Sequence, residues 1–421
     1  MGVRWMRRPE AGAGARIIHV NTSASGGGVA EILANITAHD RARGRSSGWV
    51  VLDAPADFFA FTKRLHHLFH GRGSPEVLAE DGRIYRHVLA DMQQLLKADI
   101  GPQDTVVLHD PQTLGLAPWA AERARHVYWH CHIGSMQDPE GVKPHLWAFF
   151  GEDLRAVEAV LVTERRYLTG APVAQVRLVH PAIDPDAPKN VALTGTEVAS
   201  HLRAIGTSAA TSRIGPAGRI WQDGPVPERA PLVLQVSRWD PLKGMGDVLR
   251  AAPRLNPGTH VVLAGPDPAE VLDDPEGVDQ LTSTLQQLWA LPDTVRSRVH
   301  VIALSAHDRD LNALRVNALQ RRADVVVQRS LEEGFGLSVT EAMFKAKPVV
   351  ATRTGGIPRQ IRHGVSGLLV DPGDDDAFAA GVNELVLDSD LRAGFGAAAE
   401  NAVRERYLID RLAGDYHSLR N

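Results

Sequence analysis

Short apolar strands alternate with helical stretches from one end of this chain to the other. The strand-like runs are rich in Val, Ile, Leu and aromatic residues, and they do not alternate strictly between apolar and polar side chains. Such runs are typical of strands that are buried on both faces of a parallel sheet. Repeated alternation of strand and helix predicts βαβ units, and therefore an α/β protein with doubly wound sheets.

The pattern occurs twice along the chain. The predicted strands of the first series are Arg16–Asn21, Trp49–Asp53, Thr105–His109, His126–His132, Ala159–Thr163 and Val176–His180. Those of the second series are Leu232–Ser237, His260–Gly265, Val299–Leu304, Asp324–Gln328, Pro348–Thr352 and Gly367–Val370. The predicted helices between them include Val29–His39, Leu146–Ala156, Leu311–Arg322 and Gly336–Lys345. We therefore predict two Rossmann-like domains of similar size, at residues 15–184 and 231–395.

Three segments fall outside the two series. Residues 185–230 are rich in Pro, Gly, Ser, Thr and Ala, and contain one weak helix around Glu197–Ile205, so we predict a connecting loop. Residues 1–14 are predicted to form a loose tail. Residues 396–421 are predicted to form terminal helices that pack back toward the first domain. Because ligands of doubly wound sheets bind at the carboxyl ends of the strands, we expect the site in a cleft where the two domains face each other.

Composition excludes several classes of protein. Lys and Arg together number 46 and Asp and Glu 50, so the net charge of -4 argues against a general nucleic-acid surface. The single cysteine, Cys131, excludes an intrachain disulfide framework and a zinc site of several cysteines. No apolar run approaches the ~20 residues that a membrane helix needs. We therefore expect a cytoplasmic protein with neither nucleic acid nor membrane as a partner.

A glycine-rich segment follows the first predicted strand. It reads Asn21-Thr-Ser-Ala-Ser-Gly-Gly-Gly-Val-Ala-Glu31 and opens the first predicted helix. Glycines let a ligand approach the backbone closely, and a helix N-terminus favours an anion. The segment is not the dinucleotide fingerprint, which would need a glycine at Glu31, and it is not a Walker A loop, because no Lys-Ser or Lys-Thr follows. A flexible turn is the alternative interpretation.

Two further motifs follow strands of the second series. Arg238 and Lys243 lie in Val-Ser-Arg-Trp-Asp-Pro-Leu-Lys-Gly, where two cations can neutralise a diphosphate, although a pair of solvated charges is the simpler interpretation. The segment Glu333-Gly-Phe-Gly-Leu-Ser-Val-Thr-Glu341 places one glutamate before a helix and another about two turns along it. Backbone N–H groups of Gly334, Phe335, Gly336 and Leu337 offer an anion site there.

Histidines are frequent, but we predict no metal site among them. His130 and His132 lie on one face of a predicted strand, and Cys131 lies on the other. This arrangement does not make a good metal cluster.

The spacing of Glu333 and Glu341 resembles the signature of retaining glycosyltransferases of family 4, which have the GT-B fold. The resemblance covers most of the chain and is greatest to the trehalose glycosyltransferring synthases. It extends over Gly26-Gly-Gly-Val-Ala-Glu31, His109-Asp-Pro-Gln112, Cys131-His-Ile133, Pro181-Ala-Ile-Asp-Pro185, Asp273-Asp-Pro-Glu-Gly277 and Thr354-Gly-Gly-Ile357. The longer segment at 185–230 and His130 depart from the pattern.

The resemblance implies a role for each matched residue. Arg238 and Lys243 are expected to hold a donor diphosphate, Glu333 to contact the donor sugar, Glu341 to contact the ribose, and Gly27 and Gly28 to lie against the phosphates or sugar. His132 is expected near the reacting carbon, with Asp110 and Gln112 on the acceptor side. With His132, Arg238, Lys243 and Glu333 as the catalytic set, no metal and no cofactor are expected beyond the nucleotide-sugar substrate. The resemblance allows a homodimer, which no sequence feature indicates.

The expected reaction is transfer of a hexose, best assigned as glucose, from a nucleoside diphosphate sugar to a small polar acceptor. Glucose as the acceptor gives trehalose. One alternative keeps the chemistry and uses a cyclitol, aminocyclitol or nucleoside. Three other hypotheses are a sugar-nucleotide epimerase or hydrolase of the same fold, a nucleotide-sugar sensor and an NAD-dependent oxidoreductase. The absence of the dinucleotide fingerprint argues against the oxidoreductase.

Overall fold

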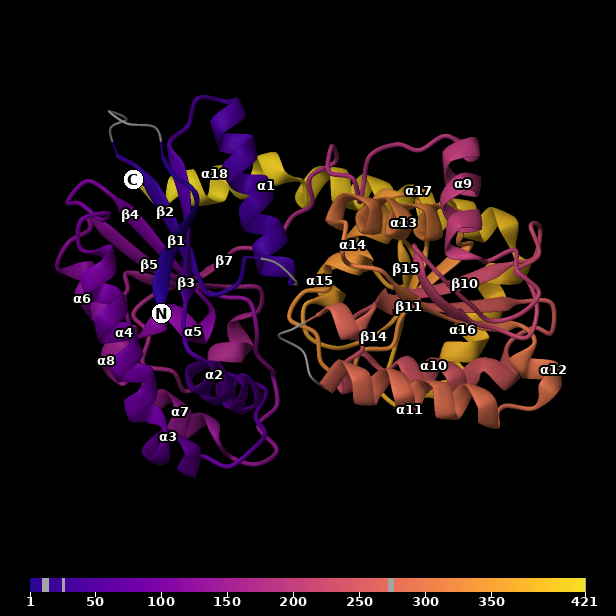
Figure 1. The fold of residues 1–421 in the computed structure, drawn as a ribbon, viewed down its shortest axis with the longest axis horizontal. Helices are drawn as coiled ribbons and strands as arrows, with labels where there is room; N and C mark the ends of the chain where they lie inside the picture. The colour runs from indigo at the N-terminus through magenta and orange to yellow at the C-terminus, as the bar shows by residue number, and fades with distance from the viewer. Residues whose placement is uncertain (10–14, 25–26, 272–275, 421) are drawn as a thin grey trace. The chain divides into compact units, whose positions relative to one another are not determined.

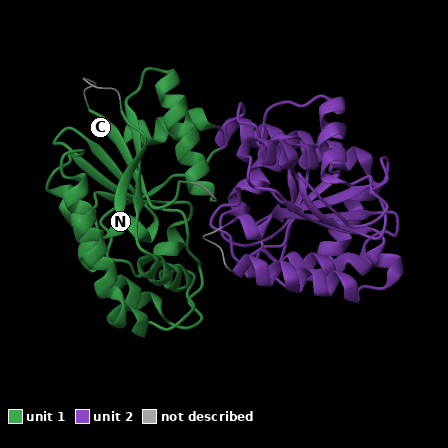
Figure 2. Cartoon of the chain, viewed as in Figure 1, with its two compact units in different colours: residues 1–182, 409–421 green, residues 183–408 purple. Residues whose placement is uncertain are grey.

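The computed structural model describes residues 1–9, 15–24, 27–271 and 276–420. The chain divides into two compact units, residues 1–182 with 409–421 and residues 183–408 (Figure 2). Each unit contains one α/β sheet with helices packed against it (Figure 1). The predicted α/β class with two doubly wound domains is therefore confirmed.

Unit 1 is built on a seven-stranded sheet in the order β1-β3-β2-β4-β5-β6-β7. Its strands are β1 (Gly2–Arg7), β2 (Ile17–Asn21), β3 (Ser47–Asp53), β4 (Thr105–His109), β5 (His126–Cys131), β6 (Ala159–Val162) and β7 (Val176–Leu178). Its helices are α1 (Gly28–Ala42), α2 (Ala56–Phe69), α3 (Glu76–Glu80), α4 (Gly82–Leu96), α5 (Asp110–Leu114), α6 (Ala117–Ala121), α7 (Lys143–Phe149), α8 (Gly151–Arg155) and α18 (Ile409–Ser418). Strands β2 to β7 pair in parallel, and β1 pairs antiparallel with β3.

Unit 2 is built on an eight-stranded sheet in the order β15-β14-β13-β10-β11-β12-β9-β8. Its strands are β8 (Arg213–Gly215), β9 (Gly218–Trp221), β10 (Leu232–Val236), β11 (His260–Pro266), β12 (Val299–Leu304), β13 (Val325–Gln328), β14 (Val349–Thr352) and β15 (Gly367–Val370). Its helices are α9 (Gly195–Ile205), α10 (Met245–Ala251), α11 (Glu276–Ala290), α12 (Asp293–Arg296), α13 (Arg309–Arg322), α14 (Leu337–Phe344), α15 (Ile357–Gln360), α16 (Asp375–Leu387) and α17 (Ser389–Arg406). Every strand predicted from the sequence in either unit is present, with ends shifted by at most two residues.

The prediction that residues 185–230 form a connecting loop is wrong, although the helix predicted around Glu197–Ile205 is present as α9. Strands β8 and β9 form an antiparallel hairpin, and β9 pairs antiparallel with β12, so the segment extends the second sheet. Helix α9 packs against α13, and its start carries a capping box in which Thr194 and Glu197 each bond the other's backbone N–H. The segment escaped prediction because its strands have only three and four residues.

Both ends of the chain also differ from the prediction. Residues 2–7 of the predicted tail form β1, while residues 10–14 lie outside the described ranges. Of the two terminal helices, α17 belongs to unit 2 and packs against α14, whereas α18 belongs to unit 1 and packs against α1 (Figure 1). None of the helices in the described ranges has the length and apolar character that a bilayer crossing requires.

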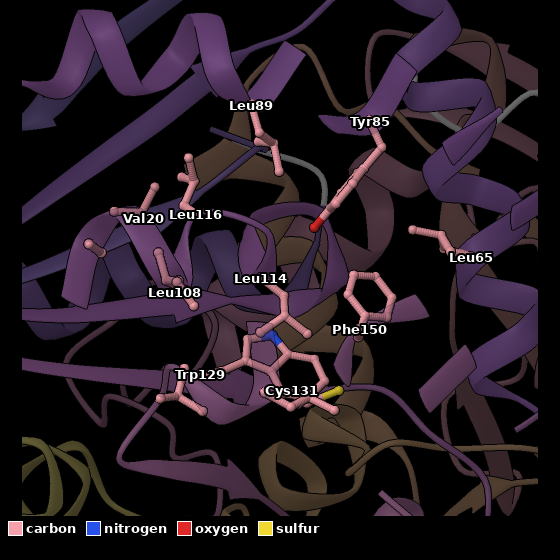
Figure 3. Close-up of a cluster of buried hydrophobic side chains, with 14 of the residues drawn as sticks. Val20, Leu65, Tyr85, Leu89, Leu108, Leu114, Leu116, Trp129, Cys131 and Phe150 are labelled. Carbon is pink, nitrogen blue, oxygen red and sulfur yellow. The ribbon is translucent and has the colours of Figure 1, made fainter. Parts of the chain in front are cut away.

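The two faces of the central strands in unit 1 differ in chemistry. One face is apolar, with Leu108, Trp129 and Cys131 packed into a core that also holds Tyr85 and Phe150 (Figure 3). The other face carries histidines, and helix α18 covers it through Tyr416, whose hydroxyl lies 2.7 Å from Nδ1 of His130. Cys131 is thus a core residue, and burial raises the pKa of its thiol well above the ordinary value.

Candidate active site

The end of β4 and the turn into α5 hold the first group of predicted residues. Asp110 follows β4 directly and has a φ of 61°, in the left-handed region that non-glycine residues rarely adopt. The core supports this turn, because the Tyr85 hydroxyl donates to Pro111 O and accepts from Gly115 N, both at 2.7 Å. Strain of this kind concentrates at functional sites, which makes Asp110 a functional candidate independently of any motif.

The carboxyl group of Asp110 lies beside the backbone of His132, because β4 and β5 are neighbours in the sheet. Its Oδ1 accepts from the His132 backbone N–H at 2.9 Å. Burial raises the pKa of Asp110 to about 7, and the His132 N–H offsets part of that rise. Nearby, Oε1 of Gln112 is buried and has no hydrogen-bond partner among the described residues. An unpaired amide oxygen two residues from a carboxyl group is suited to accept hydrogen bonds from hydroxyl groups of a polar ligand.

A cluster of four histidines lies on the same side of the sheet. His19 from β2, His109 from β4, and His130 and His132 from the end of β5 bring their rings together because these strands are neighbours. The sequence analysis placed only His130 and His132 on a shared strand face. Side-chain alternation along the strand could also have identified His19 and His109, because both point away from the apolar core.

Three of these rings also fit the simplest criterion for a metal site. One ring nitrogen each from His109, His130 and His132 lies within 4.8 Å of the others, a grouping that the sequence analysis did not foresee. However, His109 Nδ1 and His132 Nε2 already lie 2.9 Å apart in a hydrogen bond. His130 stacks on His132 with ring centroids 3.9 Å apart and planes 27° apart, and two stacked rings cannot both direct a lone pair at one ion. The geometry fits a hydrogen-bonded cluster better than a ligand set.

The glycine-rich segment after β2 begins α1. Gly27 is the N-cap residue, with an ordinary φ of -140°, and Gly28 is the first helical residue and is exposed. A Cβ at Gly27 would meet no protein atom within 4 Å. The backbone at Gly27 is therefore open, as close approach of a ligand would need, and glycine is also a favoured residue at an N-cap. Ser25 and Gly26 of the segment lie outside the described residues.

The loop after β10 in unit 2 presents the two predicted cations. The guanidinium of Arg238 is partly exposed and lies 3.6 Å from the Asp240 carboxylate. Lys243 Nζ lies 2.8 Å from Oε2 of Glu333. The loop packs closely on the end of β13 because Gly244 has a φ of 63°, and a Cβ there would lie 2.1 Å from a backbone oxygen. Lys243 and Glu333 are thus brought together, although 90 positions separate them in the sequence.

Glu333 sits in a network of polar side chains at the strand ends. Its Oε2 also accepts from the Ser330 hydroxyl at 3.0 Å, and Gln328 links that hydroxyl to the hydroxyl of Ser237. Helix α14 begins just beyond, after Gly336, which has a φ of 89°. Gly334 and Leu337 are partly exposed beside it. This arrangement places a carboxylate, an ammonium group and a helix N-terminus at one edge of the sheet.

Two predicted donor residues are less accessible than the motif suggests. The ring of Phe335 is buried against Tyr407, with centroids 5.4 Å apart, so its backbone is the part that faces the turn. Glu341 is buried in α14, where its Oε1 lies 3.3 Å from Nζ of Lys189 and its Oε2 accepts from Gln320. Sequence analysis missed Lys189, because it lies in the segment interpreted as a loop.

Comparison with known proteins identifies what kind of enzyme carries these residues. A family described as "Trehalose synthase, N-terminal domain" matches residues 19–169, and one described as "Glycosyl transferases group 1" matches residues 219–402. The trehalose synthase of Rubrobacter xylanophilus is 34% identical over 409 residues, which cover 96% of this chain and 89% of that protein. The trehalose synthase of Pyrococcus horikoshii is 30% identical over 412 residues, covering 97% and 90%. This chain belongs to the trehalose synthase family.

Solved structures confirm the GT-B fold of this trehalose synthase family member. An α,α-trehalose-phosphate synthase (UDP-forming) from Burkholderia xenovorans, in complex with glucose-6-phosphate, aligns with a TM-score of 0.72 at 16% identity, covering 96% of this chain and 100% of that one. Anabaena HepE in complex with UDP and glucose aligns with a TM-score of 0.66 at 19% identity, covering 96% and 99%. Family and fold together make this protein a glycosyl-transferring enzyme whose chemistry is related to trehalose. The segment at residues 273–277 that carried part of the resemblance lies mostly outside the described residues.

Proposed function

We propose that this enzyme transfers glucose from a nucleoside diphosphate glucose to a second glucose, with retention of configuration, and so forms trehalose. The observation that carries the proposal is the Lys243–Glu333 ion pair just before α14, with Arg238 in the same loop as Lys243, in a chain of the trehalose synthase family. We place the reaction in the cytoplasm and expect no requirement for a metal ion or cofactor.

The donor side of the proposal rests on charge. As the bond from sugar C1 to the diphosphate oxygen breaks, negative charge grows on the leaving group. Arg238 and Lys243 stabilise that charge, and the stabilisation is greatest in the transition state. Glu333 accepts hydrogen bonds from the sugar hydroxyls, and its contact with Lys243 orients both groups before the donor arrives. Glu341 serves the ribose, and Gly27 and Gly28 allow the phosphates or the sugar to approach the backbone.

The acceptor side rests on Asp110, Gln112 and His132. The carboxyl group of Asp110 and the unpaired Oε1 of Gln112 can each accept a hydrogen bond from a hydroxyl group of a sugar. In the step that we propose, the acceptor oxygen attacks C1 on the face that the diphosphate leaves. The C1–O bond to the acceptor forms, the C1–O bond to phosphate breaks, and the acceptor proton passes to the departing phosphate oxygen.

The test is an assay of purified enzyme with each nucleoside diphosphate glucose and with glucose. The expected result is trehalose and one free nucleoside diphosphate, with and without a chelator. Arg238→Ala and Lys243→Ala are each expected to lower kcat by about 10²-fold or more, as for removal of a preorganised donor to an oxyanion. Arg254→Ala, which removes an exposed arginine paired with Asp376 in the same unit, is the matched control. Unchanged transfer by the first two variants refutes the proposed mechanism.

Three further arms of the assay identify the substrates and the reaction. If the enzyme transfers glucose to a cyclitol, aminocyclitol or nucleoside and forms no trehalose, that compound is the acceptor. Consumption of the donor without any acceptor indicates an epimerase or hydrolase. In the third arm the enzyme is given trehalose and inorganic phosphate. This arm is included because a trehalose phosphorylase of Grifola frondosa is 26% identical over 394 residues, although this chain covers only 52% of that protein.

A further inference from the structure

Two buried histidines and one partly exposed histidine of unit 1 form one continuous hydrogen-bonded chain. Nδ1 of His19 lies 3.0 Å from Nε2 of His109, and Nδ1 of His109 lies 2.9 Å from Nε2 of His132. The rings of His109 and His132 are nearly coplanar, with planes 11° apart, as a linear hydrogen bond in the ring plane requires. His132 stands at the partly exposed end of the chain, and His19 stands at its buried end.

All three rings are neutral at neutral pH. Burial lowers the pKa of His19 to about 4 and that of His132 to about 3, and it lowers the pKa of His109 well below the ordinary value. A neutral imidazole carries one N–H and one bare nitrogen. Each hydrogen bond between two rings needs an N–H on one ring and a bare nitrogen on the other. The protons of the three rings therefore have only two possible arrangements, and each arrangement fixes the tautomer of every ring.

The buried end distinguishes between the two arrangements. Nε2 of His19 is buried and has no hydrogen-bond partner among the described residues. In one arrangement this nitrogen is bare, and in the other it carries an N–H without an acceptor. Orphaned buried N–H groups are rarer in proteins than under-satisfied acceptors. The favoured arrangement therefore has the proton of His19 on Nδ1, which donates to His109 Nε2, while His109 Nδ1 donates to His132 Nε2.

We propose that His19 and His109 are positioning residues that hold His132 as its Nδ1–H tautomer, so that His132 offers an N–H donor to an oxygen atom of the substrate. In the opposite tautomer, the same ring would offer a bare nitrogen, which is a base. The chain of imidazoles thus decides which role His132 can take. The identity of the oxygen as a sugar hydroxyl or a phosphate rests on the proposed function, whereas the tautomer does not.

The first experiment reads the tautomer directly. Protein with ¹⁵N-labelled histidine is examined at neutral pH by long-range ¹H–¹⁵N correlation NMR, without substrate, and the His132 signals are assigned by their loss in His132→Asn. We expect a protonated Nδ1 and a bare Nε2. A proton on Nε2 of His132 overturns the proposal, and this measurement on the wild type does not depend on whether any His19 variant folds.

Substitution of His19 tests the source of the tautomer. His19→Asp replaces the Nδ1 donor with a carboxylate, which can only accept a hydrogen bond. Nε2 of His109 then carries the proton, and we expect part or all of the His132 signal to change to the Nε2–H form. His19→Asn retains an amide N–H near the position of Nδ1 and is expected to keep the wild-type tautomer. His300→Asp is the matched control, because His300 is an equally buried histidine of unit 2 that is hydrogen-bonded to His260 and Gln222. An unchanged His132 tautomer in His19→Asp overturns the proposal.

The kinetic experiment separates this proposal from the proposed function. We expect His19→Asp to lower kcat about tenfold, less than the ~10²–10³-fold cost of deleting an oxyanion donor, with KM changed less than about twofold. His19→Asn is expected to keep most of the wild-type rate. Equal losses in His19→Asp and His300→Asp overturn the positioning role. Failure of the wild type to transfer glucose refutes the proposed function and leaves the tautomer measurement standing.

Discussion

Replacing Asp110 by asparagine tests whether the site is held at a cost to stability. Asparagine removes the ionisable group and keeps the geometry, because its Oδ1 can still accept from the His132 N–H and because asparagine tolerates a φ of 61° better than most residues. The expected result is a variant that is more stable than the wild type in alkaline solution and less active in glycosyl transfer.

The magnitude follows from the two pKa values of the aspartate. The pKa is 3.8 for an unperturbed aspartate and about 7 for Asp110 in the folded protein. Since the folded state binds the proton more tightly, the free energy of unfolding falls as the pH rises from about 4 to about 7 and is level above that. The full loss is about 4 kcal/mol, of which about 2.5 kcal/mol falls between pH 5 and pH 8. Asp110→Asn removes this loss.

Amide hydrogen exchange measured on peptides from β4 and β5 is the appropriate assay, because it reports the opening of unit 1 in a two-unit protein. The stability of Asp110→Asn relative to the wild type should be greater at pH 8 than at pH 5 by about 2.5 kcal/mol. Asp91→Asn on α4, where the side chain is 43% exposed, is the matched control and should show no such change. If the stability of Asp110→Asn relative to the wild type is the same at pH 5 and pH 8, the interpretation of Asp110 as a buried carboxyl group with a raised pKa is refuted.

Two further substitutions separate packing from function. Tyr416→Phe removes the hydroxyl that lies 2.7 Å from His130 Nδ1 and should lower the free energy of unfolding of unit 1 by about 1–3 kcal/mol, measured by denaturant unfolding. A loss of less than about 0.5 kcal/mol contradicts the covering role of α18. Gly27→Ala should lower the free energy of unfolding by about 0.5–1 kcal/mol, because alanine is a poorer N-cap than glycine although a Cβ there meets no protein atom, and it should raise the donor KM severalfold. An unchanged KM refutes contact between Gly27 and the donor.

Local patterns predicted the strands of both sheets, because a buried parallel strand is a short apolar run whatever surrounds it. The same reasoning missed β1, although Val3 and Trp5 alternate with Arg4 and Met6 and pack against the core of unit 1. That alternation is the signal of a half-exposed edge strand. It was not used because the segment was interpreted from its composition as a tail.

Some features of the candidate site could likewise be predicted from local sequence patterns, and others could not. Arg238, Lys243 and the two glutamates could be named from the sequence, because each lies within a few residues of a strand end or helix start that the pattern locates. The pairing of Lys243 with Glu333 and of Lys189 with Glu341 could not be predicted, because it depends on which strands are neighbours and on the path of residues 185–230.

The histidine chain is the clearest case of what the fold adds. The sequence by itself placed His19, His109 and His132 in predicted strands, with His109 and His132 at strand ends and His132 on the same strand face as His130. Only the tertiary structure decided that they touch, because β2, β4 and β5 are adjacent in the sheet while His19 and His109 are 90 positions apart. Side-chain alternation is a local property of the chain, whereas hydrogen bonding between rings depends on strand order and register, which only the assembled sheet fixes.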